Sequence, residues 1–248
     1  MSELKGKTVA IVALGGSAHD FVMDRVNSTH YDEIWGINSV GAIFRVDRTF
    51  MMDPVSRFLD SGLAGNQTGV AREFLLQTPD KGPIYSCCLD ERVPEVILYP
   101  LQEVIQETKF SYFNNTVAYA VAFAVYSQVG KIHFYGVDFT YKQNIHFAEA
   151  GRGCVEFWCG VAVSKGIEIS VAARSGLMDN NVPIEEKLYG YHRLDNPLVQ
   201  TVIDGTLNIM PKSDYDALGI KQKEVTPPEP KDGVLIGRHD IKGVTYND

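Results

Sequence analysis

Short apolar runs alternate with longer helix-like stretches over the first two thirds of the chain. The first run, residues 8–14, is continuous and rich in β-branched side chains, which is typical of a strand covered on both faces, as in a parallel sheet. A glycine turn at residues 15–17 follows, and then a predicted helix over 18–26 with Ser17 as its N-cap. Strand, glycine turn and helix in this order predict the opening of a doubly wound α/β domain.

The alternation continues to about residue 173. The stretch 116–129 is apolar nearly all round, and this composition is typical of a helix buried against a sheet. Gly130 follows it, and a glycine in this position commonly ends a helix. We therefore expect an α/β, Rossmann-like doubly wound fold with a mainly parallel sheet. Further strands are predicted at 33–38, 48–53, 83–88, 131–138 and 166–171, and helices at 39–46 (one or two turns), 70–77, 116–129 and 147–164.

The pattern weakens after residue 173. Short helices are expected at 184–191 and 198–207. Further on, Pro227-Pro228-Glu229-Pro230 precedes three glycines, a composition that is typical of an arm or linker. A short strand over 234–236 is an alternative within this segment. The expected organisation is an α/β domain over 1–175, a helical extension of the same domain over 176–224, and an extended arm or flexible tail over 225–248.

Composition and charge narrow the class of protein. A chain of 248 residues with 45% hydrophobic residues can bury a sizeable core and is not mostly disordered. The 23 basic and 31 acidic residues give a net charge of −8, which argues against non-specific binding along a nucleic-acid backbone. Nucleotides stay open as ligands, because backbone N–H groups and helix N-termini bind phosphates in acidic proteins too.

The cysteines and the apolar stretches indicate the compartment. Cys87 and Cys88 are adjacent, and Cys154 and Cys159 are five residues apart, so neither pair has zinc-finger spacing. Buried reduced thiols are the simpler interpretation. The longest apolar stretch, 117–129, is too short to span a bilayer, and the N-terminus lacks a signal-peptide pattern. We therefore expect a cytoplasmic protein.

The glycine turn is the first candidate site. Gly15 and Gly16 allow a ligand to approach the backbone closely, and N–H groups from Ser17 onward can hold a phosphate. The turn matches neither the GxGxxG pattern nor a Walker A loop. A plain strand-to-helix turn is the alternative, but the first such turn of an α/β sheet lies at its carboxyl edge, where ligands bind.

Two further candidates follow predicted strands. Asn38 and Ser39 come after the second strand, and an amide suits a base edge or a ribose hydroxyl. Asp53 ends the third strand before Pro54, where a carboxylate can hold a metal–phosphate unit or a sugar hydroxyl. Helix capping is the alternative role for each of them.

Asn114, Asn115 and Thr116 open the predicted buried helix. Two amides and a hydroxyl at the positive end of a helix make a good site for phosphate or ribose. One of them must cap the helix, but three polar groups exceed what capping needs. We therefore favour a nucleotide-binding role here.

The candidates for catalysis follow the strand over 131–138. Asp138 ends that strand, where it can brace the neighbouring loop or contact a nucleotide. Tyr141 can steady a leaving phosphate and His146 can accept a proton from an attacking hydroxyl, although a loop histidine is most often only solvated. His19 and Asp20, beside the glycine turn, compete for the role of base.

These segments together resemble the family-42 sialyltransferases and the related archaeal 6-hydroxymethylpterin diphosphokinase-like proteins. The similarity spans about residues 7–172 and is strongest over 114–139, where a polar start opens an apolar helix and an apolar strand ends in Gly136-Val137-Asp138-Phe139. In that group, a Gly-x-Gly-Pro-Ser-like turn opens the domain. A strand ending in Gly-x-Asp-Phe follows the helix.

The resemblance implies a Rossmann-like nucleotide-binding domain, a variant of the GT-A type. It also implies transfer of a sugar from a nucleotide donor without an obligatory metal. The family's turn corresponds to residues 15–17, and its donor-binding asparagines to Asn38 and Asn115. Its tyrosine corresponds best to Tyr141 and its base to His146.

Three functions follow as hypotheses. The first is a nucleotide-dependent transferase, above all a glycosyltransferase with a nucleotide-sugar donor. The second is diphosphoryl transfer from a nucleoside triphosphate, with Mg²⁺ held by Asp53 either alone or together with Asp138. The third is a non-catalytic protein that binds or sequesters a nucleotide. The acceptor is unknown; the net charge disfavours a nucleic-acid acceptor without excluding it, and a homo-oligomer stays open.

Overall fold

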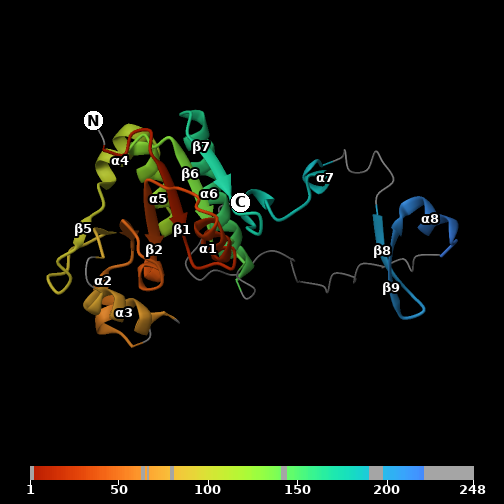
Figure 1. The fold of residues 1–248 in the computed structure, drawn as a ribbon, viewed down its shortest axis with the longest axis horizontal. Helices are drawn as coiled ribbons and strands as arrows, with labels where there is room; N and C mark the ends of the chain where they lie inside the picture. The colour runs from red at the N-terminus through yellow and green to blue at the C-terminus, as the bar shows by residue number, and fades with distance from the viewer. Residues whose placement is uncertain are drawn as a thin grey trace, which may run out of the picture. The chain divides into compact units, whose positions relative to one another are not determined.

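The computed structural model of the protein describes residues 3–62, 65, 67–78, 81–140, 144–189 and 198–220. The chain divides into two compact units, residues 1–187 and residues 188–248. The first unit is a seven-stranded sheet covered by helices, and the second contains a two-stranded hairpin and a short helix (Figure 1).

All strand pairs in the large sheet are parallel, and the strand order is β5-β4-β3-β2-β1-β6-β7. The chain adds β2 to β5 on one side of β1 and then places β6 and β7 on the other side. The order therefore reverses between β1 and β6, which is where α/β sheets of this kind bind ligands. The doubly wound parallel fold predicted from the sequence is confirmed. The strands are β1 (Thr8–Val12), β2 (Glu33–Ile37), β3 (Arg48–Phe50), β4 (Ile84–Ser86), β5 (Val96–Leu98), β6 (Lys131–Tyr135) and β7 (Glu168–Val171).

Helices cover both faces of this sheet. The helix α5 is buried at eight of its eleven positions and packs beside α6 on one face, as its apolar composition predicts. Among the helices of the described residues, none has both the length and the apolar character needed to cross a bilayer. The helices of this unit are α1 (Ala18–Val26), η1 (Asn38–Ala42), α2 (Val55–Asp60), α3 (Thr68–Gln77), α4 (Leu101–Thr108), α5 (Thr116–Tyr126), α6 (Ile145–Ser164), η2 (Leu177–Asp179) and α7 (Ile184–Lys187).

The central strand β1 shows why its sequence lacks polar alternation. Val9 and Ile11 belong to the core cluster that includes α5 and α6, whereas Ala10 and Val12 belong to the cluster with Phe21 of α1. All four strand residues are fully buried. Because both faces of the strand meet helices, each position must be apolar.

The second unit corrects one prediction. The short helix expected over 198–207 is wrong: these residues form strand β8 (Leu198–Ile203), the turn and the start of β9 (Thr206–Pro211), which pair antiparallel. Asp204 and Gly205 both have positive φ angles, 50° and 77°, as a two-residue hairpin turn requires. Helix α8 (Lys212–Ala217) follows.

Parts of the expected organisation lie beyond these observations. The arm predicted over 225–248, with its strand at 234–236, lies outside the described residues. The expected domain boundaries at residues 175 and 224 stay a prediction. The helix expected over 184–191 is observed as α7, which ends at Lys187.

A half-buried ion pair joins β2 to β3. The Arg48 guanidinium donates to both carboxylate oxygens of Glu33, at 2.6 and 3.1 Å, and the Trp35 Nε1–H donates to the same carboxylate at 2.8 Å. The two charged side chains are only 13% and 19% exposed. Burial alone would raise the pKa of Glu33, but the hydrogen bonds from Arg48 and Trp35 outweigh it and lower the pKa below its ordinary value of 4.5.

We predict a pH-dependent effect of Glu33→Gln. Because the folded-state pKa is lowered, the carboxylate stabilises the fold above its unfolded-state pKa, and this stabilisation is lost as the pH falls through the folded value. The variant should lose about 1–3 kcal/mol of unfolding free energy at pH 7, and the loss should shrink at pH values below about 4. Urea unfolding from pH 3 to pH 7 measures this. A loss of equal size at every pH would contradict the ion-pair explanation.

Candidate functional site

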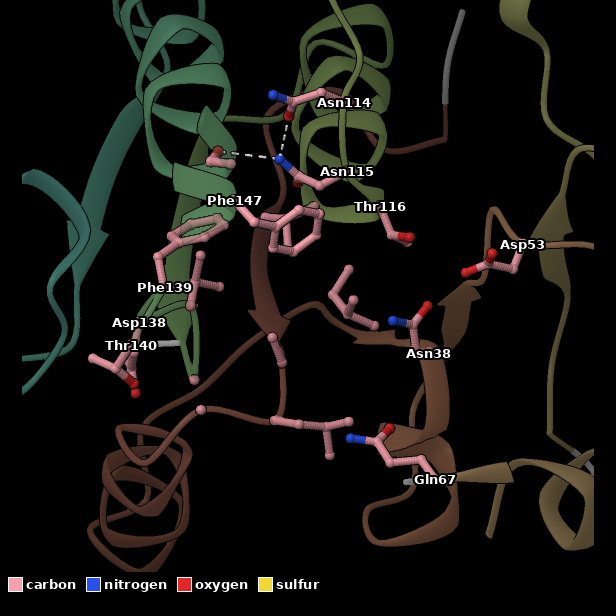
Figure 2. Close-up of a pocket in the computed structure, with 18 of the residues that line it drawn as sticks. Asn38, Asp53, Gln67, Asn114, Asn115, Thr116, Asp138, Phe139, Thr140 and Phe147 are labelled. Atoms are coloured by element: carbon pink, nitrogen blue, oxygen red, sulfur yellow. Dashed lines mark hydrogen bonds between the residues drawn. The ribbon is translucent and has the colours of Figure 1, made fainter. Parts of the chain in front are cut away.

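A cavity of about 780 Å³ opens at the carboxyl ends of β1, β2, β3 and β6. It therefore lies at the reversal of strand order between β1 and β6. Figure 2 shows three walls: the N-terminus of α5, the ends of β2 and β3, and the loop after β6. The residues predicted from sequence that line it are Gly15, Gly16, Asn38, Asp53, Asn114, Asn115, Thr116 and Asp138.

A buried carboxylate joins the two loops on either side of this reversal. Asp138 is only 8% exposed, and its oxygens accept hydrogen bonds from the Ser17 N–H at 2.8 Å and the Ser17 hydroxyl at 2.5 Å. The Ser17 Oγ in turn accepts from the Gly136 N–H at 2.8 Å. A Cβ on Gly15 would lie 2.5 Å from an Asp138 oxygen, so only glycine allows this approach. Ser17 thus braces the glycine turn from beneath and does not line the cavity.

The glycine turn offers fewer donors than its sequence suggested. The first three N–H groups of α1 donate to the carbonyl oxygens of residues 15–17. The Gly15 N–H donates to the Gly136 carbonyl at 2.8 Å. Within the described residues, the Gly16 N–H has no acceptor, so it is the donor of this turn that a ligand can reach.

The two asparagines before α5 bind protein atoms. The Asn115 Oδ1 caps the helix by accepting from the Ala118 N–H at 3.0 Å, and its Nδ2 donates to Asn114 Oδ1 and to the Gly151 carbonyl (Figure 2). The Asn114 Nδ2 donates to the Ala150 carbonyl at 2.8 Å. The pair therefore ties the start of α5 to α6, which explains why two amides stand where one cap would suffice.

The backbone at the start of α5 supplies the open donors. The first N–H groups of a helix have no acceptor inside the helix, and the end carries a partial positive charge. The N–H groups of Thr116 and Val117 have no acceptor among the described residues, and both residues line the cavity. The Thr116 side chain faces the same space (Figure 2). This wall of the cavity suits an anion.

The wall formed by β2 and β3 carries an unsatisfied amide. Asn38 has a φ of +55°, a left-handed conformation that asparagine tolerates better than other residues with a side chain. Its Oδ1 is buried and has no hydrogen-bond donor in the described structure. An orphaned polar atom at a residue that lines the cavity is consistent with a ligand-binding position. Ser39 is buried behind it and donates to Gln67 Oε1 at 2.6 Å, so it orients a cavity residue without lining the cavity.

Asp53 lies on the same wall and is paired with a cation. The Arg57 Nη1 is 2.5 Å from Asp53 Oδ1, four residues away, and both residues line the cavity. Sequence reasoning missed Arg57 and Gln67, because α2 was not predicted and α3 begins just after Gln67. The arginine at the i+4 position from Asp53 was the available signal.

These carboxylates do not fit a metal ion held by the protein. Asp53 accepts a hydrogen bond from the Arg57 guanidinium, and Asp138 accepts two from Ser17. Within the described part of the chain, no three His, Cys, Asp or Glu side chains form a potential ligand cluster. We therefore derive no step of the chemistry through Mg²⁺.

The third wall is aromatic. Phe139 and Phe147 line it together with Thr140 (Figure 2). Phe139 also has a positive φ, 52°, and its ring lies against Gly151 of α6, where a Cβ would be 2.8 Å from the ring. The shape of this wall thus depends on the absence of a side chain at residue 151.

The two predicted catalytic residues are placed differently from the rest. His146 lies in the first turn of α6, does not line the cavity, and has a side chain that is 92% exposed, with its Nδ1 3.9 Å from a carboxylate oxygen of Glu149. Tyr141 lies outside the described residues. Their catalytic roles stay predictions.

Comparison with known proteins gives structural matches alone. No protein-family model and no curated protein matches the sequence. The sialyltransferase CstII from Campylobacter jejuni, in complex with the substrate analogue CMP-3FNeuAc, aligns with 86% of this chain and 98% of its own at 16% identity and a TM-score of 0.45. The alpha-2,3-sialyltransferase from that organism in apo form aligns with 74% and 83% at 14% identity and a TM-score of 0.46. CstII in complex with cytidine-5'-monophosphate aligns with 87% of this chain and 98% of its own, at 13% identity and a TM-score of 0.44. These values do not assign the chain to a family.

We predict opposite effects for two glycine substitutions in α6. Gly151→Ala should push Phe139 from the cavity wall and destabilise the protein by about 1–3 kcal/mol, because the new Cβ overlaps the ring. Gly160→Ala, in the same helix with no atom within 4 Å of the new Cβ, should stabilise it by about 0.5–1 kcal/mol. Urea unfolding of both variants measures the difference. Equal effects would show that the Phe139–Gly151 contact is unimportant.

Proposed function

We propose that the protein is a transferase that binds a nucleotide sugar in this cavity, a glycosyltransferase. The observation that carries the proposal is the start of α5. Its N–H groups at Thr116 and Val117 have no acceptor among the described residues and open into a cavity at the reversal of strand order. A helix N-terminus in this position binds phosphate. The volume, about 780 Å³, lies within the range of small-molecule sites.

The donor is proposed to lie with its phosphate at α5. The Gly16 N–H adds a donor from the turn after β1, and the amides of Asn38 and Gln67 face the sugar or ribose hydroxyls. The aromatic wall of Phe139 and Phe147 offers apolar contact to a base or a sugar ring. Each of these groups lines the one cavity.

The proposed reaction requires charge stabilisation and a base. The acceptor hydroxyl oxygen attacks the anomeric carbon, and the bond from that carbon to the phosphate oxygen breaks with its electron pair leaving on the phosphate. The partial positive charge at the start of α5 stabilises this developing negative charge. His146 is the proposed base for the acceptor proton and Tyr141 the proposed support for the leaving phosphate.

We predict that Asn38→Gly binds nucleotide less tightly without losing stability. Glycine adopts the φ of +55° freely, so the variant removes the amide while keeping the backbone. Calorimetric titration with nucleoside mono- and diphosphates and their sugars should show about tenfold weaker binding. CMP and CMP-3FNeuAc belong in this panel, because the comparison structures contain them. Glu103→Gln, on the exposed side of α4, is the matched control. Unchanged affinity in Asn38→Gly would remove Asn38 from the site.

The base is tested separately. His146→Ala should keep nucleotide affinity and lower turnover by roughly a hundredfold or more. His30→Ala is the control, because the His30 side chain is also largely exposed, at 83%, and His30 lies before β2 and does not line the cavity. If turnover is the same in both variants, His146 takes no part in the mechanism.

The two other hypotheses have distinct outcomes. Because Asp53 is paired with Arg57, we expect nucleotide binding and turnover to survive EDTA. Loss of activity in EDTA that Asp53→Asn reproduces would favour metal-dependent diphosphoryl transfer. Tight nucleotide binding without product after prolonged incubation would favour a non-catalytic binding protein.

A further inference from the structure

We propose that the sugar taken by this cavity carries no carboxylate and instead presents hydroxyl or amino hydrogens to the wall formed by β2 and β3. This inference rests on the proposed function and specifies its substrate class. It follows from the separation of donors and acceptors within the cavity.

Hydrogen-bond acceptors dominate the β2–β3 wall. The Asn38 Oδ1 is buried and lacks a donor, so a ligand that fills this position must bring an N–H or O–H. Asp53 stands beside it, because Ile37 and Phe50, at the ends of the paired strands β2 and β3, are partners in register. Figure 2 shows the Asn38 amide and the Asp53 carboxylate both directed into the cavity. A hydroxyl or an ammonium group satisfies both acceptors, whereas a carboxylate satisfies neither.

The charges point the same way. The described residues that line the cavity include two carboxylates, Asp53 and Asp138, and one guanidinium, Arg57, which is already 2.5 Å from Asp53. The start of α5 can accommodate the phosphate. A second negative group on the sugar would lie near Asp53 without a cation of its own, and like charges in a partly enclosed site repel.

A different arrangement would reverse this conclusion. Arg57 is 54% exposed and, if it left Asp53, could pair with a sugar carboxylate. In that case, removing the guanidinium would weaken the binding of carboxylated sugars most. The two arrangements therefore predict opposite effects of charge-removing substitutions on this wall.

The test uses nucleotide sugars that differ only in the carboxylate. Calorimetric titration compares UDP-glucose with UDP-glucuronate, UDP-glucosamine with both, and CMP with CMP-3FNeuAc. We expect the wild-type protein to bind the uncharged or amino member about tenfold more tightly than the carboxylated one, and CMP at least as tightly as CMP-3FNeuAc. Asp53→Asn should reduce the preference about tenfold. Glu103→Gln, which removes one exposed charge from α4, should leave it unchanged.

The possible results separate this inference from the proposed function. Tighter wild-type binding of the carboxylated sugars, lost in Arg57→Gln, would overturn the inference and leave nucleotide-sugar binding intact. An equal preference in wild type and Asp53→Asn would also overturn it. If neither the UDP nor the CMP series binds, and the other nucleotides fail as well, the proposed function fails with it.

Discussion

The hydrogen bonds between Ser17 and Asp138 hold the centre of the site together. They connect the turn after β1 with the loop after β6, which are 121 residues apart in sequence. The approach is close because Gly15 and Gly136 have no side chains there: a Cβ on either would lie within 2.5 Å of a backbone oxygen of the other loop. Together with the hydrogen bond from the Gly15 N–H to the Gly136 carbonyl, this joint fixes the separation of the two loops that flank the reversal of strand order, and with it the shape of the cavity between them.

At the start of α5, the polar side chains bind other parts of the protein and leave backbone groups for a ligand. Asn115 caps the helix, and Asn114 and Asn115 both donate hydrogen bonds to carbonyl groups of α6. This leaves the backbone N–H groups of α5 for an anion. The same holds at the glycine turn, where Ser17 and most of the N–H groups are used internally. Polar residues clustered at a helix start can thus hold the scaffold that exposes the binding groups.

The opposite wall contains a polar atom without a partner. The Asn38 Oδ1 is buried and has no hydrogen-bond donor in the described structure, which costs free energy. Asn38 also has a positive φ, a conformation that asparagine tolerates better than other residues with a side chain. Beside it, Ser39 donates a hydrogen bond to Gln67 Oε1 and so orients a residue that lines the cavity.

Local patterns determined much of the fold. The β-branched run of β1, the apolar composition of α5 and the glycine turn depend on neighbouring residues, and they were sufficient to predict a parallel sheet and the gathering of Gly15, Asn38, Asp53 and Asn115 at its carboxyl edge. The Asp204-Gly205 turn was an equally local signal for the hairpin that the helix prediction missed.

Tertiary structure decided the rest. The short elements α2, β5 and α4 have three to eight residues, too few for a clear period, and they form because they pack against longer ones. The presence of Arg57 and Gln67 in the cavity depends on α2 and on the Ser39 contact, and the position of Phe139 depends on Gly151. Asn114 faces α6, and the Asn38 Oδ1 has no donor among the described residues. Both facts depend on contacts between segments far apart in the chain, which no local sequence pattern encodes.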